Sequence, residues 1–388
     1  MDLILHFQEI FSKTPSVLGR APGRVNLLGE HVDYNGGIVL PAAIDRAVSI
    51  AAAPTGDDLI TLRALDLYQQ VSFRIGDLEQ RVDVQGSPLP HWALYPAGVA
   101  WSLRQAGYAV SGMEAVYTSD VPIGAGLSSS AAVEVCFGTV WRALGGWQME
   151  CMELARLCQR AENQYVGVNC GLMDQFASAC AVEGHALYFD TRSLDYHPVS
   201  LPPGTAIIIA DSGIRRSLAN SAYNERRAAC EQAVELLRKY LPEITSLRDV
   251  TTVEFAAYSE YLPPLICKRA EHVVKEIHRV EMAVNALRGA DAKLFGGLMF
   301  AGHASLRDLY EVSVPELDIL VETARNLPGI YGARLTGAGF GGCTVNLVAE
   351  AQAEAFIAGL MQGYEEKTGR QAQVYWCHAS AGAAAQLI

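Results

Sequence analysis

Residues 121–134 read VPIGAGLSSSAAVE, a run of small residues between a predicted strand and a predicted helix. A β-rich run at residues 115–121 leads into small residues, whose backbone can approach a ligand closely. A helix is expected to follow, with Ser128 or Ser129 as its N-cap and residues 145–146 as its glycine stop. Its free N–H groups and the positive end of its dipole favour a bound anion. Considered alone, the stretch also fits an ordinary cap and turn.

The loop has no lysine, and none occurs anywhere between Lys13 and Lys239. A Walker phosphate-binding loop requires Gly-Lys-Ser/Thr, in which the lysine reaches the β and γ phosphates. A Rossmann domain would open with a βαβ unit that carries Gly-x-Gly-x-x-Gly. The pattern therefore disfavours both of these nucleotide-binding classes.

Bulk composition limits the choice of partner. The 388 residues are half hydrophobic, which is enough for two cores. The net charge is −12 and there is no dense Lys/Arg run, so we expect no nucleic-acid partner. No apolar stretch is long enough to span a membrane, and residues 3–11 predict a docked amphipathic helix rather than a signal peptide. We expect a cytoplasmic protein without a membrane partner.

The nine cysteines show neither Cys-x-x-Cys pairs nor metal-ligand spacing. An odd number in a large chain favours reduced thiols over a disulfide framework. Cys136, Cys158 and Cys180 lie in apolar stretches and are predicted to be small buried side chains.

The chain divides into two differently patterned halves. The first alternates β-rich runs with two strong helices, one after the 121–134 loop and one over residues 149–164. Predicted strands at 185–192 and 205–211 flank Pro-Pro-Gly at 202–204, which predicts domains 1–204 and 205–388. The second half is rich in helices and closes with helix, strand, strand, helix, strand. That order is typical of an α+β layer on a mostly antiparallel sheet.

Three other segments carry candidate chemistry. Residues 20–46 crowd charged and hydrogen-bonding side chains beside an apolar run, which is costly unless a ligand or mutual bonds satisfy them. Residues 169–180 place Asp174 at the start of a short predicted helix, where it could instead be an N-cap. Residues 335–345 join two strands through glycines at 337, 339, 341 and 342, which predicts unusual dihedral angles or close approach to a ligand.

Together these segments resemble a known set. GRVNLLGEHVDYN (23–35) is similar to the galactokinase signature. GAGLSSSAA (124–132), CGLMDQF (170–176) and TGAGFGGC (336–343) resemble motifs of the galactose, homoserine, mevalonate and phosphomevalonate kinase superfamily. The resemblance implies an α+β, two-lobed small-molecule kinase. Its N-terminal lobe would be ribosomal-S5-domain-2-like and its C-terminal lobe ferredoxin-like, with the active site in the cleft between them.

The implied reaction transfers the ATP γ-phosphoryl group to the C1 hydroxyl of galactose, in galactose catabolism by the Leloir pathway. The resemblance assigns Asp174 as catalytic base and Arg24 as its cationic neighbour. Asp174 could alternatively act chiefly as an orienter. Galactose would be bound by five residues: Glu30, His31, Asp33, Gly171 and Tyr223.

ATP would be bound by the loop residues Gly124, Ala125, Gly126, Leu127, Ser128, Ser129 and Ser130. Trp92 would lie near the adenine, although core packing is an almost equal alternative. Ser130 and Glu162 would hold Mg²⁺, whereas without the resemblance a surface salt bridge would suit Glu162 better. A metal role for His31 is not expected.

Two other functions stay open on the sequence. A related kinase could act on arabinose or N-acetylgalactosamine, and a non-catalytic sensor could bind sugar and ATP without turnover. We expect galactose and ATP as the small-molecule partners and a monomer, with a dimer as the alternative.

Overall fold

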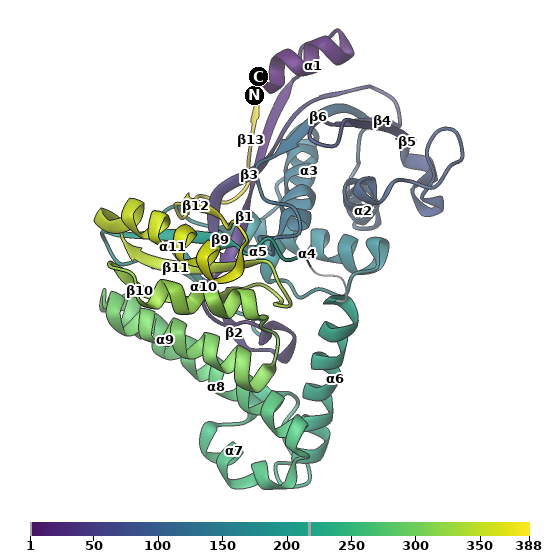
Figure 1. The fold of residues 1–388 in the computed structure, drawn as a ribbon. Helices are drawn as coiled ribbons and strands as arrows, with labels where there is room; N and C mark the ends of the chain where they lie inside the picture. The colour runs from purple at the N-terminus through teal and green to yellow at the C-terminus, as the bar shows by residue number, and fades with distance from the viewer. Residues whose placement is uncertain (1, 216–218) are drawn as a thin grey trace.

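The computed structural model describes residues 2–215 and 219–388, with the side chains of residues 219–221 outside the description. The N-terminal half is built on a six-stranded sheet in the order β13-β1-β3-β6-β4-β5 (Figure 1). The pairing is antiparallel except between β4 and β6. The strands are β1 (Val17–Asn26), β3 (Pro41–Pro54), β4 (Leu59–Ala64), β5 (Gln69–Arg74), β6 (Met113–Ser119) and β13 (Ala384–Leu387).

The helices of this half are α1 (Leu3–Phe11), α2 (His91–Gln105), α3 (Ser129–Gly145), α4 (Cys151–Arg160) and α5 (Met173–Cys180). The predicted N-terminal helix is confirmed, and its Phe7 is fully buried. The predicted 149–164 helix is α4 followed by a π-helical turn, Ala161–Val166. Sequence patterning missed α2 because Pro96 lies inside it.

A small sheet joins β2 (Ile38–Val39), β7 (His185–Asp190) and β8 (Tyr196–Ser200) in the order β2-β7-β8. The strands predicted on either side of residues 202–204 therefore lie in different sheets, because β9 (Thr205–Asp211) belongs to the C-terminal half.

The C-terminal half contains the antiparallel sheet β10-β11-β9-β12, completed by β10 (Ile330–Thr336), β11 (Cys343–Ala349) and β12 (Gln373–Cys377). Its helices are α6 (Ala219–Leu237), α7 (Thr252–Tyr258), α8 (Pro264–Arg288), α9 (Ala292–Ser305), α10 (Pro315–Arg325) and α11 (Ala353–Thr368). The order β9–helices–β10–β11–α11–β12 is the β-α-β-β-α-β pattern of a ferredoxin-like lobe. The predicted closing pattern is confirmed.

Strand β9 is buried on both faces. Ile207 and Ile209 pack into a core with Val25 and Leu127 of the N-terminal half. Ile208 and Ala210 point to the opposite face, as alternation along a strand requires, and join the core that contains α10 and α11. One face of the C-terminal sheet thus packs against the N-terminal half together with α8 and α9, which brings the glycine-rich loops of both halves close together.

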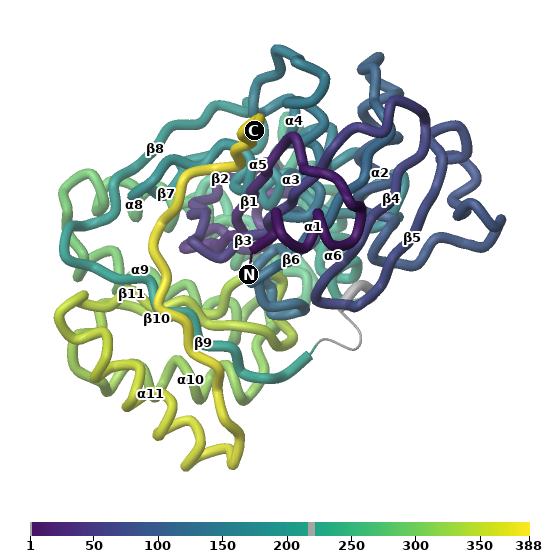
Figure 2. Tube along the Cα trace, turned by 90° about the horizontal axis from the view of Figure 1, so that it is seen from above, coloured from purple at the N-terminus to yellow at the C-terminus, as the bar shows by residue number. Residues whose placement is uncertain are grey.

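The last strand returns to the first sheet, where β13 pairs with β1 (Figure 2). In Figure 2 the yellow C-terminal segment runs from the C-terminal sheet back toward α1. The division into domains 1–204 and 205–388 stays a prediction, and β13 is a segment of the second range that lies in the first sheet.

One expectation about cysteine is wrong. Cys151 and Cys180 form a disulfide with Cα atoms 5.3 Å apart, because α4 and α5 pack together and bring these residues within bonding reach. Cys136 and Cys158 are buried free thiols, as predicted. Across residues 2–215 and 219–388, no helix has the length and apolar character needed to cross a bilayer.

Candidate active site

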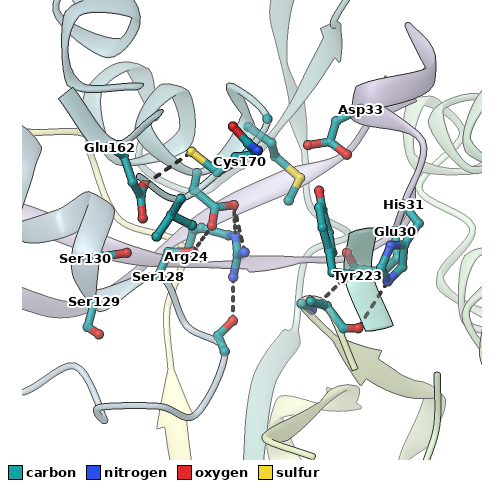
Figure 3. Close-up of a pocket in the computed structure, with 18 of the residues that line it drawn as sticks. Arg24, Glu30, His31, Asp33, Ser128, Ser129, Ser130, Glu162, Cys170 and Tyr223 are labelled. Carbon is teal, nitrogen blue, oxygen red and sulfur yellow. Dashed lines mark hydrogen bonds and ion pairs between the residues drawn. The ribbon is translucent and has the colours of Figure 1, made fainter. Parts of the chain in front are cut away.

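A cavity of about 430 Å³ is lined by residues from both halves of the chain (Figure 3). Thirteen of the sixteen predicted site residues line it. They are Arg24, Glu30, His31, Asp33, Gly124, Gly126, Ser128, Ser129, Ser130, Glu162, Gly171, Asp174 and Tyr223. Figure 3 shows Glu162 and Ser130 at one end and Glu30, His31 and Asp33 at the other.

The loop before α3 lines the end of the cavity that contains Ser130 and Glu162. Gly124 and Gly126 have φ angles of 71° and 83°, in the left-handed region that glycine adopts without strain. Ala125 and Leu127 are buried in the core and do not line the cavity, so of the predicted loop residues only Gly124, Gly126 and the serines at 128–130 border it. Ser128 occupies the N-cap position of α3, as predicted, but its side chain makes no capping hydrogen bond. The interpretation of this stretch as an ordinary helix cap is therefore wrong.

Arg24 connects this loop to α5. Its guanidinium donates to the Gly126 carbonyl at 2.6 Å and to Asp174 Oδ1 at 2.9 Å through Nε. The Ser128 hydroxyl donates to the other carboxylate oxygen of Asp174 at 2.5 Å. Asp174 is the second residue of α5 and not its N-cap, which excludes the capping alternative. A partly exposed carboxylate is thus fixed between a cation and the phosphate-type loop.

Glu162 lies on the π-helical turn and is buried. Burial raises the pKa of its carboxyl to about 7; hydrogen bonds from Cys170 and Ser130 oppose the rise, whereas the charge of Asp174 adds to it. Gln175 donates to both Glu162 and Glu134, at 2.6 and 3.0 Å, and so bridges two buried acids. The surface salt-bridge alternative for Glu162 is excluded by this burial.

This acid-rich end suits a hard cation that keeps some of its own waters. Glu134 is fully buried, and its Oε1 has no hydrogen-bond partner among the described residues. A divalent ion would compensate such charge through the Ser130 hydroxyl and the Glu162 carboxylate, leaving its other positions for phosphate and water. Within residues 2–215 and 219–388, no cluster of three or more Asp, Glu, His or Cys side chains could hold a metal alone.

At the other end, Glu30 is buried and accepts from the Gly337 N–H at 2.7 Å. Burial raises the pKa of the Glu30 carboxyl, against the nearby charges of Arg334 and Arg24. Burial also raises the pKa of Asp33 to about 6, and the charges of Asp174 and Glu30 add to the shift.

Gly171 packs directly on Asp33. A Cβ atom at position 171 would lie 1.8 Å from Asp33 Oδ2, so a side chain there would displace the Asp33 carboxylate. The predicted sugar-binding carboxylate and the predicted backbone contact are therefore adjacent in space. Tyr223, on α6, faces the same end, with its ring centroid 5.5 Å from that of His31.

The glycine-rich turn between β10 and β11 closes this end of the cavity through Gly337 and Ala338. Glycines 337, 339, 341 and 342 all have positive φ, which confirms the predicted unusual dihedral angles. At position 339 a Cβ would meet the Val312 carbonyl oxygen at 2.3 Å.

Trp92 does not line the cavity. It packs against Tyr117, with ring centroids 6.0 Å apart, and its indole N–H donates to Gln69 at 2.5 Å. This placement favours the core-packing alternative for Trp92. The contact between Trp92 and the adenine stays a prediction.

Sequence reasoning missed several lining residues, of which Arg215 is the most informative. Arg215 pairs with Asp211 through two bonds of 2.8 and 2.9 Å and approaches Gly124. It thereby supplies a second cation beside the lysine-free loop. Its only local signal is the i,i+4 acid–base spacing at the end of β9. Four others also went unmarked: Gly167, Val168, Asn169 and Asn224. The remaining lining residues lie in segments that the sequence had singled out, but they were not assigned as site residues: Cys170, Met173, Gly337 and Ala338.

The chain is similar to known proteins over almost its whole length. Residues 5–54 match the galactokinase galactose-binding signature, residues 95–181 the GHMP kinases N terminal domain, and residues 283–365 the GHMP kinases C terminal domain. The galactokinase of Roseiflexus sp. (strain RS-1) is 47% identical over 381 residues, which covers 98% of this chain and 96% of that protein. The galactokinase of Chloroflexus aurantiacus is 45% identical, with 97% and 95% covered.

Solved structures show the same relationship. The crystal structure of Lactococcus lactis galactokinase complexed with galactose superposes with a TM-score of 0.92 at 36% identity and covers 98% of both chains. Mevalonate kinase of Methanococcus jannaschii, at 18% identity and a TM-score of 0.67 over 94% of this chain and 98% of that one, shares the fold. The expected two-lobed kinase fold is therefore confirmed, and the chain belongs to the galactokinase family.

Proposed function

We propose that this protein transfers the γ-phosphoryl group of ATP to the C1 hydroxyl of galactose, giving galactose 1-phosphate and ADP. The observation that carries the proposal is one continuous cavity. It joins the Arg24–Asp174 pair and the phosphate-type loop to the Glu30–Asp33 end. A phosphate donor at the first end and a sugar at the second would meet at Asp174.

The chain's main contribution is alignment, because phosphoryl transfer requires positioning and charge neutralisation more than covalent help. Backbone N–H groups of the loop and the N-terminus of α3 would bind phosphate oxygens. The guanidiniums of Arg24 and Arg215 would neutralise negative charge that a Walker lysine neutralises elsewhere. Mg²⁺, held by Ser130 and Glu162, would supply further neutralisation of the phosphates when bound.

Asp174 would orient the C1 hydroxyl and receive its proton. Both carboxylate oxygens already accept hydrogen bonds, from Arg24 and Ser128, so the side chain has one fixed orientation. In a loose transition state the hydroxyl becomes acidic only as its bond to phosphorus forms. The proton therefore moves late, and a well-placed carboxylate suffices to accept it.

The sugar would be recognised by acceptors at the opposite end. Glu30 and Asp33 are carboxylates that can each accept from hydroxyl groups, and Gly171 leaves room beside Asp33. Ring faces of His31 and Tyr223 complete this end. A buried polar site of this kind discriminates strongly against a sugar that lacks the matching hydroxyl.

A sugar panel with ATP and Mg²⁺ tests the proposal. Galactose should yield a phosphorus NMR signal of an anomeric phosphate, and kcat/KM for glucose should be at least ~10³ lower. Faster turnover of arabinose or N-acetylgalactosamine would assign another sugar kinase. Sugar binding without any turnover would indicate a sensor, and a 6-phosphate product would contradict the proposed chemistry.

We also infer that the working state is a cytoplasmic monomer. One chain supplies every group that the proposed reaction uses, including Arg24, Asp174 and Glu162, so the chemistry calls for no residue of a second copy. Sedimentation at assay concentration tests this, and a dimer there would contradict it.

A further inference from the structure

A line of hydrogen bonds leads from His31 into the protein interior. His31 Nδ1 lies 2.9 Å from the Tyr34 hydroxyl, which lies 2.7 Å from the Tyr310 hydroxyl. The Tyr310 hydroxyl in turn lies 3.3 Å from the Cys230 sulfur. On the other side of the ring, His31 Nε2 lies 3.1 Å from the Ala338 carbonyl oxygen. None of Tyr34, Tyr310 and Cys230 lines the cavity.

The groups at the two ends of this line determine which atom donates in each of its hydrogen bonds. A carbonyl oxygen only accepts, so His31 Nε2 carries the hydrogen. In a neutral imidazole Nδ1 then accepts, and Tyr34 must donate to it. Because a tyrosine has one hydroxyl hydrogen, Tyr310 must donate to Tyr34.

Reversal of the line is unfavourable. If His31 Nδ1 also carried a hydrogen, Tyr34 would have to accept it and donate to Tyr310. Tyr310 would then have to donate to the sulfur of Cys230, which is a weak acceptor. The favoured arrangement is therefore the one in which Tyr310 donates to Tyr34 and Tyr34 donates to His31.

The donors are buried and firmly placed. Burial raises the pKa values of Tyr34 and Tyr310 well above 10, and that of Cys230 to about 11, so all three keep their protons near neutral pH. Tyr310 is fully buried, and its own carbonyl accepts from Arg226 Nε at 2.8 Å. Its ring also packs against His272, with centroids 4.5 Å apart.

We propose that Tyr34 and Tyr310 are positioning residues that hold His31 in one orientation, as the Nε2–H tautomer, before a sugar arrives. The ring then meets the sugar without reorientation, and binding avoids that ordering cost. This inference rests on the proposed function only in assigning His31 to the sugar end. Tyr310 follows α9, far from the signature segment in sequence, and no motif of the signature points to it.

Nitrogen-15 NMR of the sugar-free wild-type protein tests the tautomer directly. The chain has nine histidines, so a His31→Gln variant is needed to assign the His31 signals. The Nε2–H pattern is expected at neutral pH. An Nδ1–H tautomer or an imidazolium would overturn the proposal. This measurement involves no sugar, so it stands even if galactose proves not to be the substrate.

Tyr310→Phe removes one hydroxyl and frees the Tyr34 oxygen to accept from His31. We expect mixed His31 tautomers and a galactose KM raised about 2- to 10-fold, the scale of one net hydrogen bond. The kcat should change less than twofold, because the variant loses affinity for galactose but no interaction that forms only in the transition state. Tyr34→Phe should act similarly, and the double variant should show less than the product of the two effects, because both act through His31.

Tyr364→Phe is the matched control. Tyr364 is also fully buried, and its hydroxyl donates to the Ser212 carbonyl at 2.8 Å, outside the cavity lining. This variant should keep the wild-type His31 signals and galactose KM. If Tyr310→Phe leaves both unchanged, or if Tyr364→Phe changes them equally, the positioning role is refuted. If wild-type enzyme fails to phosphorylate galactose, the proposed function fails while the NMR result still decides the tautomer.

Discussion

Replacing Asp33 with asparagine is expected to stabilise the sugar-free protein while it weakens galactose phosphorylation. Burial, reinforced by the charges of Asp174 and Glu30, raises the pKa of Asp33 from 3.8 to about 6. Ionised Asp33 therefore costs folding free energy near neutral pH. Asparagine has nearly the same shape and carries no charge at any pH, so it removes this cost.

The structure sets the size of the gain. The folded-state pKa lies about 2.2 above the unfolded value, from about 6 minus 3.8. Each pKa unit corresponds to about 1.36 kcal/mol, which gives about 3 kcal/mol as an upper limit. Because the Asp33 carboxylate faces the cavity, water screens part of this cost. We therefore expect Asp33→Asn to raise the free energy of unfolding by about 1–3 kcal/mol.

The sign of the pH dependence is fixed. The folded state binds the Asp33 proton more tightly than the unfolded chain does, so the cost of ionisation is full above pH 6. It declines as the pH falls through 6 and disappears below about 3.8. The advantage of Asp33→Asn over wild type should therefore be about half as large near pH 5 as near pH 7.5.

Urea unfolding of sugar-free wild type and variant at the two pH values measures this advantage. Asp195→Asn is the matched control, because it removes one carboxylate from an exposed position outside the cavity, and it should leave the stability difference near zero. In the same preparations, kcat/KM for galactose should fall at least about tenfold in Asp33→Asn, the scale of a hydrogen bond to a charged group. A variant that is less stable than wild type near neutral pH, or a gain that does not depend on pH, would refute the reasoning.

Three further changes test other parts of the cavity. Asp174→Asn keeps the shape of the side chain but removes the proton acceptor, so turnover should fall at least ~10²-fold while ATP affinity changes little. A variant that keeps more than a tenth of wild-type turnover would contradict the role of Asp174 as proton acceptor. Gly171→Ala would place a Cβ 1.8 Å from Asp33 Oδ2, so the galactose KM should rise at least about tenfold; an unchanged KM would show that Asp33 does not bind the sugar. Glu162→Gln should raise the Mg²⁺ concentration needed for activity, whereas galactose affinity, measured by calorimetry without nucleotide, should stay constant. Weaker sugar binding with an unchanged Mg²⁺ requirement would oppose the metal assignment.

Much of the fold could be predicted because its signals are local. Apolar spacing over residues 3–11 predicted α1, and the order of helices and strands after residue 313 predicted the α+β layer of the C-terminal half. The exceptions have local causes too. Pro96 concealed α2, and β1 was not recognised because its sequence, VLGRAPGRVN, contains two glycines and a proline.

The site was predicted as a set of residues but not as an arrangement. The family resemblance identified Arg24 and Asp174, yet 150 positions separate them, and only the packing of β1 against α5 brings them to 2.9 Å. Tyr310 carries no motif, and Arg215 has only its i,i+4 spacing from Asp211, which by itself does not indicate a site. The disulfide between Cys151 and Cys180 likewise depends on how α4 meets α5.

The order of residues along the chain establishes which chemical groups are available: a lysine-free loop, the acids at positions 30, 33, 162 and 174, and the glycines of the loops. The folded arrangement establishes what those groups can do. Side-chain type is local, whereas burial and the distance between charges depend on segments far apart in the chain. Those two quantities raise the pKa of Asp33 to about 6 and that of Glu162 to about 7. Packing of distant segments likewise places the Tyr310 hydroxyl 2.7 Å from that of Tyr34, which lies 2.9 Å from His31 Nδ1.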